Sequence, residues 1–596
     1  MKISTIPVLL ASVLCAFAGD PSWEKCYNGP ANAPDHAEAL ALDSKGNAVV
    51  TGFSTGTSGG YDMLTAKFSG KTGRRIWEQR YDGPTSQYDK GIDVAVDQQG
   101  NVVVVGQSIG TGNNYDYYTA KYSGVDGTLL WQQRFDGGYS NGDYPIDLVL
   151  DAQGNAIVTG WSYDNNNYSY YTVKYAAADG TPVWGARYRG DYYNSYGQAQ
   201  AVDVDSQGNV VVTGQSYTSY YSGNYDIHTV KYAAADGAVL WTKIYNGSAN
   251  STDYGYDVAV DGEDNVVVAG MTYTNRGYNS DWDYYTAKYS GTDGSTIWEQ
   301  GLNSLNNGRD EGQRVVLNKK GDVCVTGESR NNYDEDYSGY SILTAMYSGS
   351  DGALLWNQQH SVTGYSYQYV TGLTMDSKGN PVIAGYYRDY LQQNNAYKLL
   401  GLKLNGKNGD LLWKKISPYG QKNHISRAAS VAVDDADRVF MTGYTTGSKN
   451  SSDYLIMKCG PLADGLISNV SGSKYLGDDI YNQHALKQTS TVFLAPGSTR
   501  SFNVVIQNDA PMAATYAFKG SAGSQNVSVF YTDEKGQDIT SAVRNGTYRT
   551  RKMPPGTNDV CNVRVSVDGD APRWQIVPIK MHIGDDDTLK IVVWVN

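Results

Sequence analysis

The sequence predicts an all-β protein: an eight-bladed β-propeller of four-stranded blades, followed by an Ig-like β-sandwich. Repeated landmarks carry the propeller part of this prediction. A turn motif, Asp-x-x-Gly-Asn or a looser form of it, separates two apolar runs and recurs at intervals of 54 to 58 residues. Four strands in a repeat of this length are typical of propeller blades. The eight motifs begin at Asp43, Asp97, Asp151, Asp205, Asp261, Asn318, Asp376 and Asp434.

Two further landmarks follow the turn motifs, the first after all eight of them and the second after seven. One is a strand of the Ala-Lys-Tyr type, centred on Lys67, Lys121, Lys174, Lys231, Lys288, Met346, Lys403 and Lys458. The other is a tryptophan four residues after a glycine, found at Trp77, Trp131, Trp184, Trp241, Trp298, Trp356 and Trp413. An eighth tryptophan, Trp23, precedes the first turn motif. We therefore expect the N-terminal strand to complete the last blade, which closes the ring and removes a free sheet edge.

One repeat shows why each unit is expected to form four strands. Residues 91–97 alternate, 101–106 are a valine run, 116–122 alternate again, and 128–135 contain the tryptophan. Runs of β-branched and aromatic residues between Gly, Asn and Asp turns are strand signals, and no helical periodicity competes with them. The turn aspartate is expected to accept local backbone N–H groups, and the turn glycine to adopt a positive φ.

The two ends of the chain differ from the repeats. Residues 1–18 have the charge, apolar run and Ala-x-Ala site of a secretory signal peptide, so we expect export to the extracellular space, the periplasm or the cell surface. The propeller is assigned to 19–460 and a linker to 461–488. Residues 489–596 contain short alternating strands and are assigned to the Ig-like β-sandwich. No later segment approaches the apolar length of a membrane span.

The propeller repeats resemble the bacterial secreted β-propeller repeat family often labelled SBBP. The resemblance rests on the D-x-x-G-N turn, the Val-Thr-Gly that follows it and the Ala-Lys-Tyr strand, and it covers about residues 20 to 460. It implies a secreted or envelope-associated propeller. Segments such as 126–131 are also similar to the tryptophan-docking motif of eight-bladed quinoproteins, and the C-terminal region resembles accessory domains of secreted bacterial proteins.

Tyrosine is the most informative residue type for a function. The chain has 51 tyrosines, and many fall in the loops that join the second strand to the third and one blade to the next. These loops share one face of a propeller. Tyrosine with Ser, Asn and Gly is typical of binding surfaces, although long solvated loops could also carry such residues. The expected ligand-binding residues are Tyr115, Tyr117, Tyr192, Tyr193, Tyr220, Tyr225, Tyr284, Tyr340 and Tyr387.

Two smaller groups of residues are candidate sites of other kinds. Asp93, Asp147 and Asp257 each lie early in an innermost strand, where three carboxylates could hold calcium. Hydrogen bonding between blades is the alternative that we favour. Cys26 and Cys459 lie on the two strands that close the ring, and export would permit a disulfide between them. The repeat register offsets them by four or five residues, which argues against the bridge.

These observations favour a monomeric, non-enzymatic binding or scaffold protein. The expected partner is an extracellular carbohydrate or protein, with no cofactor other than calcium. The formal charge of −13 argues against a nucleic-acid partner. The six histidines form no zinc motif, and the two Gly-x-Ser-x-Gly segments lack the strand-to-helix context of a hydrolase. The alternatives are an exported carbohydrate-active enzyme, a quinone-dependent oxidoreductase and a purely structural surface protein.

Overall fold

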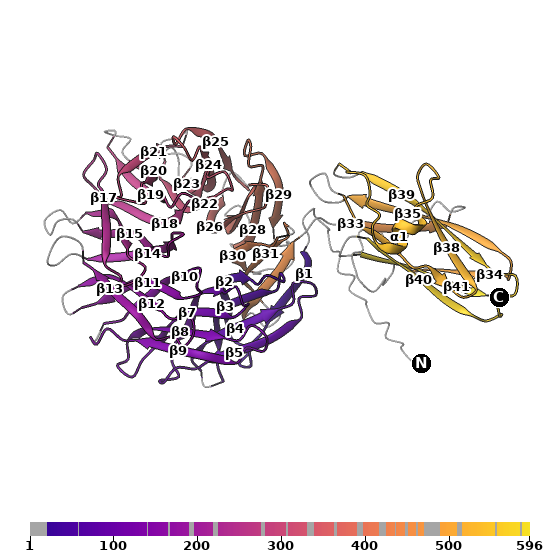
Figure 1. Ribbon diagram of the computed structural model, residues 1–596, viewed down its shortest axis with the longest axis horizontal. Helices are drawn as coiled ribbons and strands as arrows, with labels where there is room; N and C mark the ends of the chain where they lie inside the picture. The colour runs from indigo at the N-terminus through magenta and orange to yellow at the C-terminus, as the bar shows by residue number, and fades with distance from the viewer. Residues whose placement is uncertain are drawn as a thin grey trace, which may run out of the picture. The chain divides into compact units, whose positions relative to one another are not determined.

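Eight four-stranded sheets are arranged around one axis in this computed structural model (Figure 1). They belong to one compact unit, Trp23–Cys459. Seven sheets are built from consecutive strands, whereas the eighth combines β30, β31 and β32 with the N-terminal strand β1. The eight-bladed propeller and its closure by the Trp23 strand are therefore confirmed. The innermost strands are the first of each blade, and the outermost carry the tryptophans.

The strands are bounded as follows. Blade 1 contains β2 (Asp35–Leu42), β3 (Ala48–Thr55), β4 (Tyr61–Phe68) and β5 (Arg75–Tyr81). Blade 2 contains β6 (Asp89–Val96), β7 (Val102–Ile109), β8 (Tyr115–Tyr122) and β9 (Leu129–Phe135). Blade 3 contains β10 (Tyr144–Leu150), β11 (Ala156–Tyr163), β12 (Tyr168–Tyr175) and β13 (Pro182–Tyr188). Blade 4 contains β14 (Gly197–Val204), β15 (Val210–Tyr217), β16 (Tyr225–Tyr232) and β17 (Val239–Tyr245).

The remaining blades follow the same order. Blade 5 contains β18 (Asp253–Val260), β19 (Val266–Thr274), β20 (Asp281–Tyr289) and β21 (Thr296–Leu302). Blade 6 contains β22 (Asp310–Leu317), β23 (Val323–Arg330), β24 (Tyr340–Tyr347) and β25 (Leu354–His360). Blade 7 contains β26 (Ser366–Met375), β27 (Pro381–Asp389), β28 (Tyr397–Leu404) and β29 (Leu411–Ile416). Blade 8 contains β30 (Ser426–Val433), β31 (Val439–Thr446), β32 (Ser452–Cys459) and β1 (Pro21–Tyr27).

The structure describes residues 21–595 with several gaps. The expected signal peptide, 1–18, lies outside the described residues. In the described part, no helix is both long and apolar enough to cross a membrane. The gaps are 58, 140, 165–166, 190–195, 218–223, 276–280, 305–307, 331–338, 363–365, 390–396, 417–424, 436, 447–450, 460–462, 470–488, 509–514, 555–556 and 584–586.

The second strand of each blade is buried on both faces. In β7, the valines at 102 to 105 are 0% exposed. The sequence of such a strand is an unbroken apolar run because a neighbouring blade covers each face of the sheet. Strands of parallel sheets, whose two faces are covered by helices, have the same pattern. The core of the propeller therefore consists of successive layers between blades, and the described clusters each draw residues from adjacent blades.

The turn motif joins neighbouring blades through a buried lysine. Oδ1 of Asp97 accepts N–H bonds from Gln99 and Asn101, and Oδ2 pairs with Lys121 at 2.8 Å. Burial would raise the pKa of Asp97, but the bonds from Lys121 and Asn101 hold it below its ordinary value. Lys121 Nζ also donates to the Ala177 carbonyl of blade 3 at 3.0 Å. The expected structural role of the turn aspartate is thus observed.

Each of seven described tryptophans packs on a glycine of the next blade. The Trp77 ring lies under Gly127, whose φ is +78°, and its Nε1 donates to the Gly124 carbonyl at 3.3 Å. The Lys67 ammonium donates to the same carbonyl at 2.7 Å. Trp23 makes the equivalent contact with Gly73 of blade 1. The other five pairs join Trp131 to Gly180, Trp184 to Gly237, Trp241 to Gly294, Trp298 to Gly352 and Trp356 to Gly409.

The C-terminal unit contains two sheets around one apolar core. One sheet has the order β33-β35-β39-β38-β37 and the other β34-β41-β40-β36. Side chains from both sheets, such as Phe502 and Ile579, are 0% exposed in one cluster. The linker prediction for 461–488 is wrong in part, because 463–469 form β33 and pair with β35. The Ig-like relationship stays a prediction.

The elements of this unit are short. Its strands are β33 (Ala463–Asn469), β34 (Thr489–Leu494), β35 (Thr499–Asn508), β36 (Phe518–Gly520), β37 (Gly523–Ser524), β38 (Val527–Asp533), β39 (Asn558–Val567), β40 (Ile576–Ile583) and β41 (Asp587–Val595). Its helix α1 spans Thr540–Asn545. The pair β34 and β41 is parallel.

Replacing a glycine that packs on a tryptophan ring by alanine should destabilise the protein more than the same replacement at a glycine with a similar φ in open space. We expect Gly127→Ala to lower the free energy of unfolding by about 1–3 kcal/mol more than Gly100→Ala, because its Cβ would lie 2.9 Å from the Trp77 ring. Gly100 has φ +83° and nothing within 4 Å, so Gly100→Ala isolates the backbone cost of a positive φ, about 1–2 kcal/mol. Urea unfolding measures both, and equal losses would contradict the docking role.

Candidate binding face

One end of the ring, which we call the loop face, gathers four strand ends from every blade. The start of the first strand, the end of the second, the start of the third and the end of the fourth lie there, because neighbouring strands in a blade run antiparallel. The register shows this directly: His36 of β2 lies opposite Phe53 of β3, and Tyr144 of β10 lies opposite Trp161 of β11. The turn motifs lie at the opposite end.

Aromatic side chains follow one another around the loop face in three arcs, which together we call the aromatic belt. Neighbouring rings within each arc have centroids 3.7 to 6.5 Å apart. The first arc contains Tyr444, His36, Phe53, Tyr61 and Tyr88. The second contains Tyr115, Tyr144, Trp161, Tyr168, Tyr196, Tyr217, Tyr225 and Tyr254. The third contains Tyr340, Tyr367, Tyr369, Tyr386 and Tyr397.

The belt is neither fully buried nor fully exposed. Most of its rings are half-buried, and Tyr88 is 50% exposed. Ring–ring contacts hold the side chains in place, as in His36, which stacks on Tyr444 at 3.7 Å and 6° and bonds to Ser452 Oγ at 2.6 Å. Burial, followed by the charges of Lys90 and Arg427, lowers the pKa of His36 to about 4. This ring is therefore neutral at pH 7.

The nine tyrosines expected to bind a ligand divide into three groups. Tyr115, Tyr225 and Tyr340 belong to the aromatic belt. Three others are buried: Tyr117, Tyr284 and Tyr387 are each 0% exposed, so placing them on the binding face was wrong. The remaining three, Tyr192, Tyr193 and Tyr220, lie outside the described residues.

The buried tyrosines have a structural role instead. Tyr117 donates its hydroxyl to the Tyr171 carbonyl of the next blade at 3.3 Å, and Tyr284 donates to the Leu343 carbonyl at 2.8 Å. Both lie in the third strand, where neighbouring blades cover both faces of the sheet. In the third strand, distance from the strand end decides which tyrosine reaches the loop face. In β27, alternation decides it, because Tyr386 belongs to the belt while the adjacent Tyr387 is buried.

The aspartates of the innermost strands connect blades through backbone hydrogen bonds. Each Oδ1 accepts the N–H of the following residue. Each Oδ2 accepts an N–H from the next blade: Asp93 from Leu148, Asp147 from Val202 and Asp257 from Val315. Asp203 makes the same pair of bonds, with Val204 and Val260. The sequence alone missed Asp203, because the repeat position in its blade is occupied by Ala201. These contacts show the interblade role, while calcium binding stays a prediction.

Burial raises the pKa of four aspartates of the innermost strands, which we call the axial aspartates: Asp93, Asp147, Asp203 and Asp257. The pKa of Asp257 is raised to about 7 and that of Asp203 to about 6. For Asp93, the neighbouring Asp147 carboxylate adds to the effect of burial. Arg314 acts in the opposite direction on Asp147 and Asp257, because its positive charge favours their ionised forms. This part of the ring is consequently sensitive to pH near neutrality.

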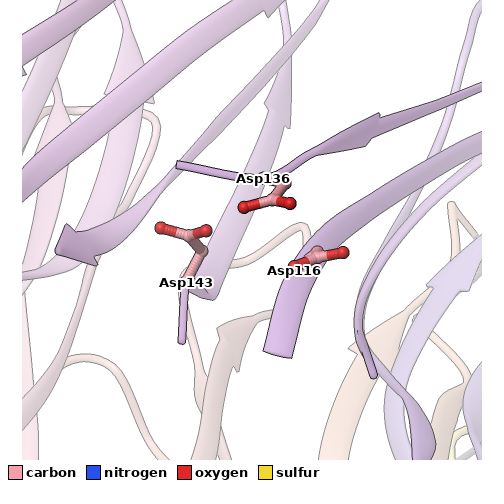
Figure 2. A group of neighbouring side chains, drawn as sticks. All are labelled: Asp116, Asp136 and Asp143. Atoms are coloured by element: carbon pink, nitrogen blue, oxygen red, sulfur yellow. The ribbon is translucent and has the colours of Figure 1, made fainter. Parts of the chain in front are cut away.

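A different trio of carboxylates lies where blades 2 and 3 meet. Figure 2 shows Asp116, Asp136 and Asp143. One carboxylate oxygen from each of them lies within 4.8 Å of the other two, a spacing at which the three could hold a metal ion. Arg134 pairs with Asp116 at 2.5 Å, and the Gly137 N–H donates to Asp143 at 2.7 Å. Asp116 and Asp143 are buried, and burial raises the pKa of each. The sequence signal that could have found this trio is its recurrence 54 residues earlier as Asp62, Asp82 and Asp89.

The two closing cysteines do not form a disulfide. Cys26 is exposed on β1, and Cys459 is buried at the end of β32.

Away from the loop face, a cavity of about 620 Å³ lies beside the turns of blades 5 and 6, lined by Asp261, Glu263, Lys319 and Lys320 among others.

Comparison with known proteins agrees with the repeat architecture. Residues 169–450 match a family model described as outer membrane protein assembly factor BamB. The chain is a β-propeller repeat protein. A 167-residue stretch is 29% identical to the beta-galactosidases LacA and LacZ of Lactobacillus acidophilus, covering 27% of this chain and 24% of each relative. The chain thus spans about a quarter of the length of these curated relatives.

Several solved structures are similar in fold at 10% sequence identity. The quinohemoprotein alcohol dehydrogenase from Comamonas testosteroni has a TM-score of 0.45, covering 74% of this chain and 76% of its own. Polysaccharide lyase Uly1 has a TM-score of 0.40, with 73% and 92% covered. The WD40 domain of SCAP from fission yeast has a TM-score of 0.39, with 74% and 98% covered.

The axial aspartates give a prediction for the pH dependence of stability. Because the pKa of Asp257 is raised to about 7, the folded chain keeps a proton that the unfolded chain releases near pH 4. Stability should therefore fall as pH rises, and Asp257 alone should account for roughly 2 kcal/mol between pH 5.5 and 8. We expect the Asp257→Asn variant to lack this pH-dependent part of the stability. Urea unfolding of the parent and the variant between about pH 5.5 and 8 measures the difference, and an equal loss of stability with pH in both proteins would contradict the prediction.

Proposed function

We propose that this chain is an exported binding protein that holds carbohydrate on the aromatic belt of its loop face. The belt is the observation that carries the proposal. Half-buried tyrosine and tryptophan rings offer apolar faces and polar edges together. Sugar rings have the complementary surface, with apolar C–H faces and hydroxyl groups that need polar partners. Rings already fixed by their neighbours lose little conformational entropy when a ligand binds.

The comparisons support a binding role without fixing its ligand. The family model matched by 169–450 is named for an assembly factor, which favours binding over catalysis. The partial similarity to two beta-galactosidases is consistent with carbohydrate as the ligand class. A protein partner is the alternative occupant of the same face, since tyrosine-rich surfaces also bind proteins.

The second candidate, an exported enzyme acting on carbohydrate, has a direct assay. The named relatives supply the substrate class, so hydrolysis of a nitrophenyl β-galactoside by the purified full chain tests it. We expect no turnover above that of a heat-denatured sample. Turnover that survives repurification would replace the binding proposal with a catalytic one.

The binding proposal is tested on a glycan array with the full chain and single-ring variants. We expect selective binding of some glycans. Among Tyr115→Ala, Tyr225→Ala and Tyr340→Ala, each variant that removes a ring in contact with the best-bound glycan should weaken its affinity at least about fivefold. The matched control is Leu130→Ala, which removes a 49% exposed side chain from the outer strand β9.

Thermal unfolding of each variant separates lost binding from lost structure. Glycan binding that all three variants retain would place the site elsewhere. The absence of any glycan ligand would favour a protein partner or a purely structural role.

A further inference from the structure

Arg427 is held in an aromatic corner of the belt. It is the second residue of β30, and its guanidinium carbon lies 3.7 Å from the ring centroid of Tyr397, 4.7 Å from Tyr386 and 5.8 Å from Tyr444. Tyr386 and Tyr397 contact each other edge to face at 5.6 Å. A cation placed over several aromatic faces is attracted to each of them, so the group is fixed in position without an anion.

The charge of Arg427 has no anionic partner among the described residues. No described carboxylate lies within 4.0 Å of its guanidinium, and its Nε is buried without a hydrogen-bond acceptor. A guanidinium has five N–H donors in a planar fork that matches a carboxylate. The tyrosine rings stabilise the positive charge of Arg427 in part, but their faces do not accept hydrogen bonds as a carboxylate does.

The equivalent positions in other blades differ in charge. The residues in the register position of Arg427 are His36 in blade 1 and Lys90 in blade 2, whereas blade 6 has Glu311 there. Lys90 is paired with Glu38 at 3.0 Å, so Arg427 is the unbalanced member of the set. Burial is the main cause of the lowered pKa of His36, and the charges of Lys90 and Arg427 lower it further.

We infer that the corner formed by Arg427, Tyr386, Tyr397 and Tyr444 binds the carboxylate of an acidic sugar, with the sugar ring against the tyrosines. This inference rests on the proposed function and names its substrate class. Arg427 would receive the carboxylate in a two-bond contact. The aromatic rings would cover the apolar face of the same sugar.

The experiment compares a charged saccharide with its uncharged ester on the full chain. Calorimetric titration with trigalacturonate and with its methyl ester should show at least tenfold tighter binding of the acid, and a loss of that preference at high salt. Arg427→Gln should remove the preference, and Arg427→Lys should retain part of it, because lysine keeps the charge but lacks the fork. The matched control, Arg74→Gln, changes an exposed arginine in the turn between β4 and β5 and should bind like the parent.

The outcomes separate this inference from the proposed function. Equal affinity for acid and ester, or a preference that survives in Arg427→Gln, would overturn the acidic-sugar site. If neutral glycans still bind, the carbohydrate-binding proposal stands while the inference fails. If no glycan binds, both fail. Arg427-dependent binding of polyglutamate in place of trigalacturonate would also overturn the inference and indicate an acidic protein partner. Thermal unfolding confirms that each variant is folded.

Discussion

The contact of one blade's tryptophan with the next blade's glycine is the constraint on which the ring depends. The Gly124 carbonyl receives both Trp77 Nε1 and Lys67 Nζ, and Asp43 fixes that lysine from its own turn. One carbonyl thus ties together the turn, the third strand and the outer strand of the preceding blade. Because Trp23 makes the same contact with Gly73, the N-terminal strand is part of the closed ring.

Tyrosine serves two purposes in this architecture, and depth in the blade separates them. Deep in the third strand, Tyr117 and Tyr284 span the blade interface and bond to carbonyls on its far side. At the strand end, Tyr115 and Tyr340 are only half-buried and join the aromatic belt. The same residue type therefore adds to the stability of the ring and to the chemistry of its loop face. High tyrosine content alone does not measure a binding surface.

The two ends of the ring are under different constraints. At the turn end, the aspartate, glycine, lysine and tryptophan contacts recur in most blades and join neighbours, although blade 6 has Asn318 and Met346 at the aspartate and lysine positions. At the loop end, the register position of Arg427 is occupied by histidine, lysine, tyrosine, glutamine or glutamate in other blades. Structure is thus secured at one end, while the other is left to vary in charge and shape.

The sequence by itself determined the number of blades, their four strands and the closure of the ring, because these follow from local turns and a fixed repeat length. It also predicted the structural role of Asp97. It misplaced Tyr117, Tyr284 and Tyr387, and it missed Asp203, the Asp116 trio and β33. Only the tertiary structure decided these, since depth between blades, contacts between residues up to 57 positions apart and pairing of β33 with β35 depend on neighbours that local sequence does not specify.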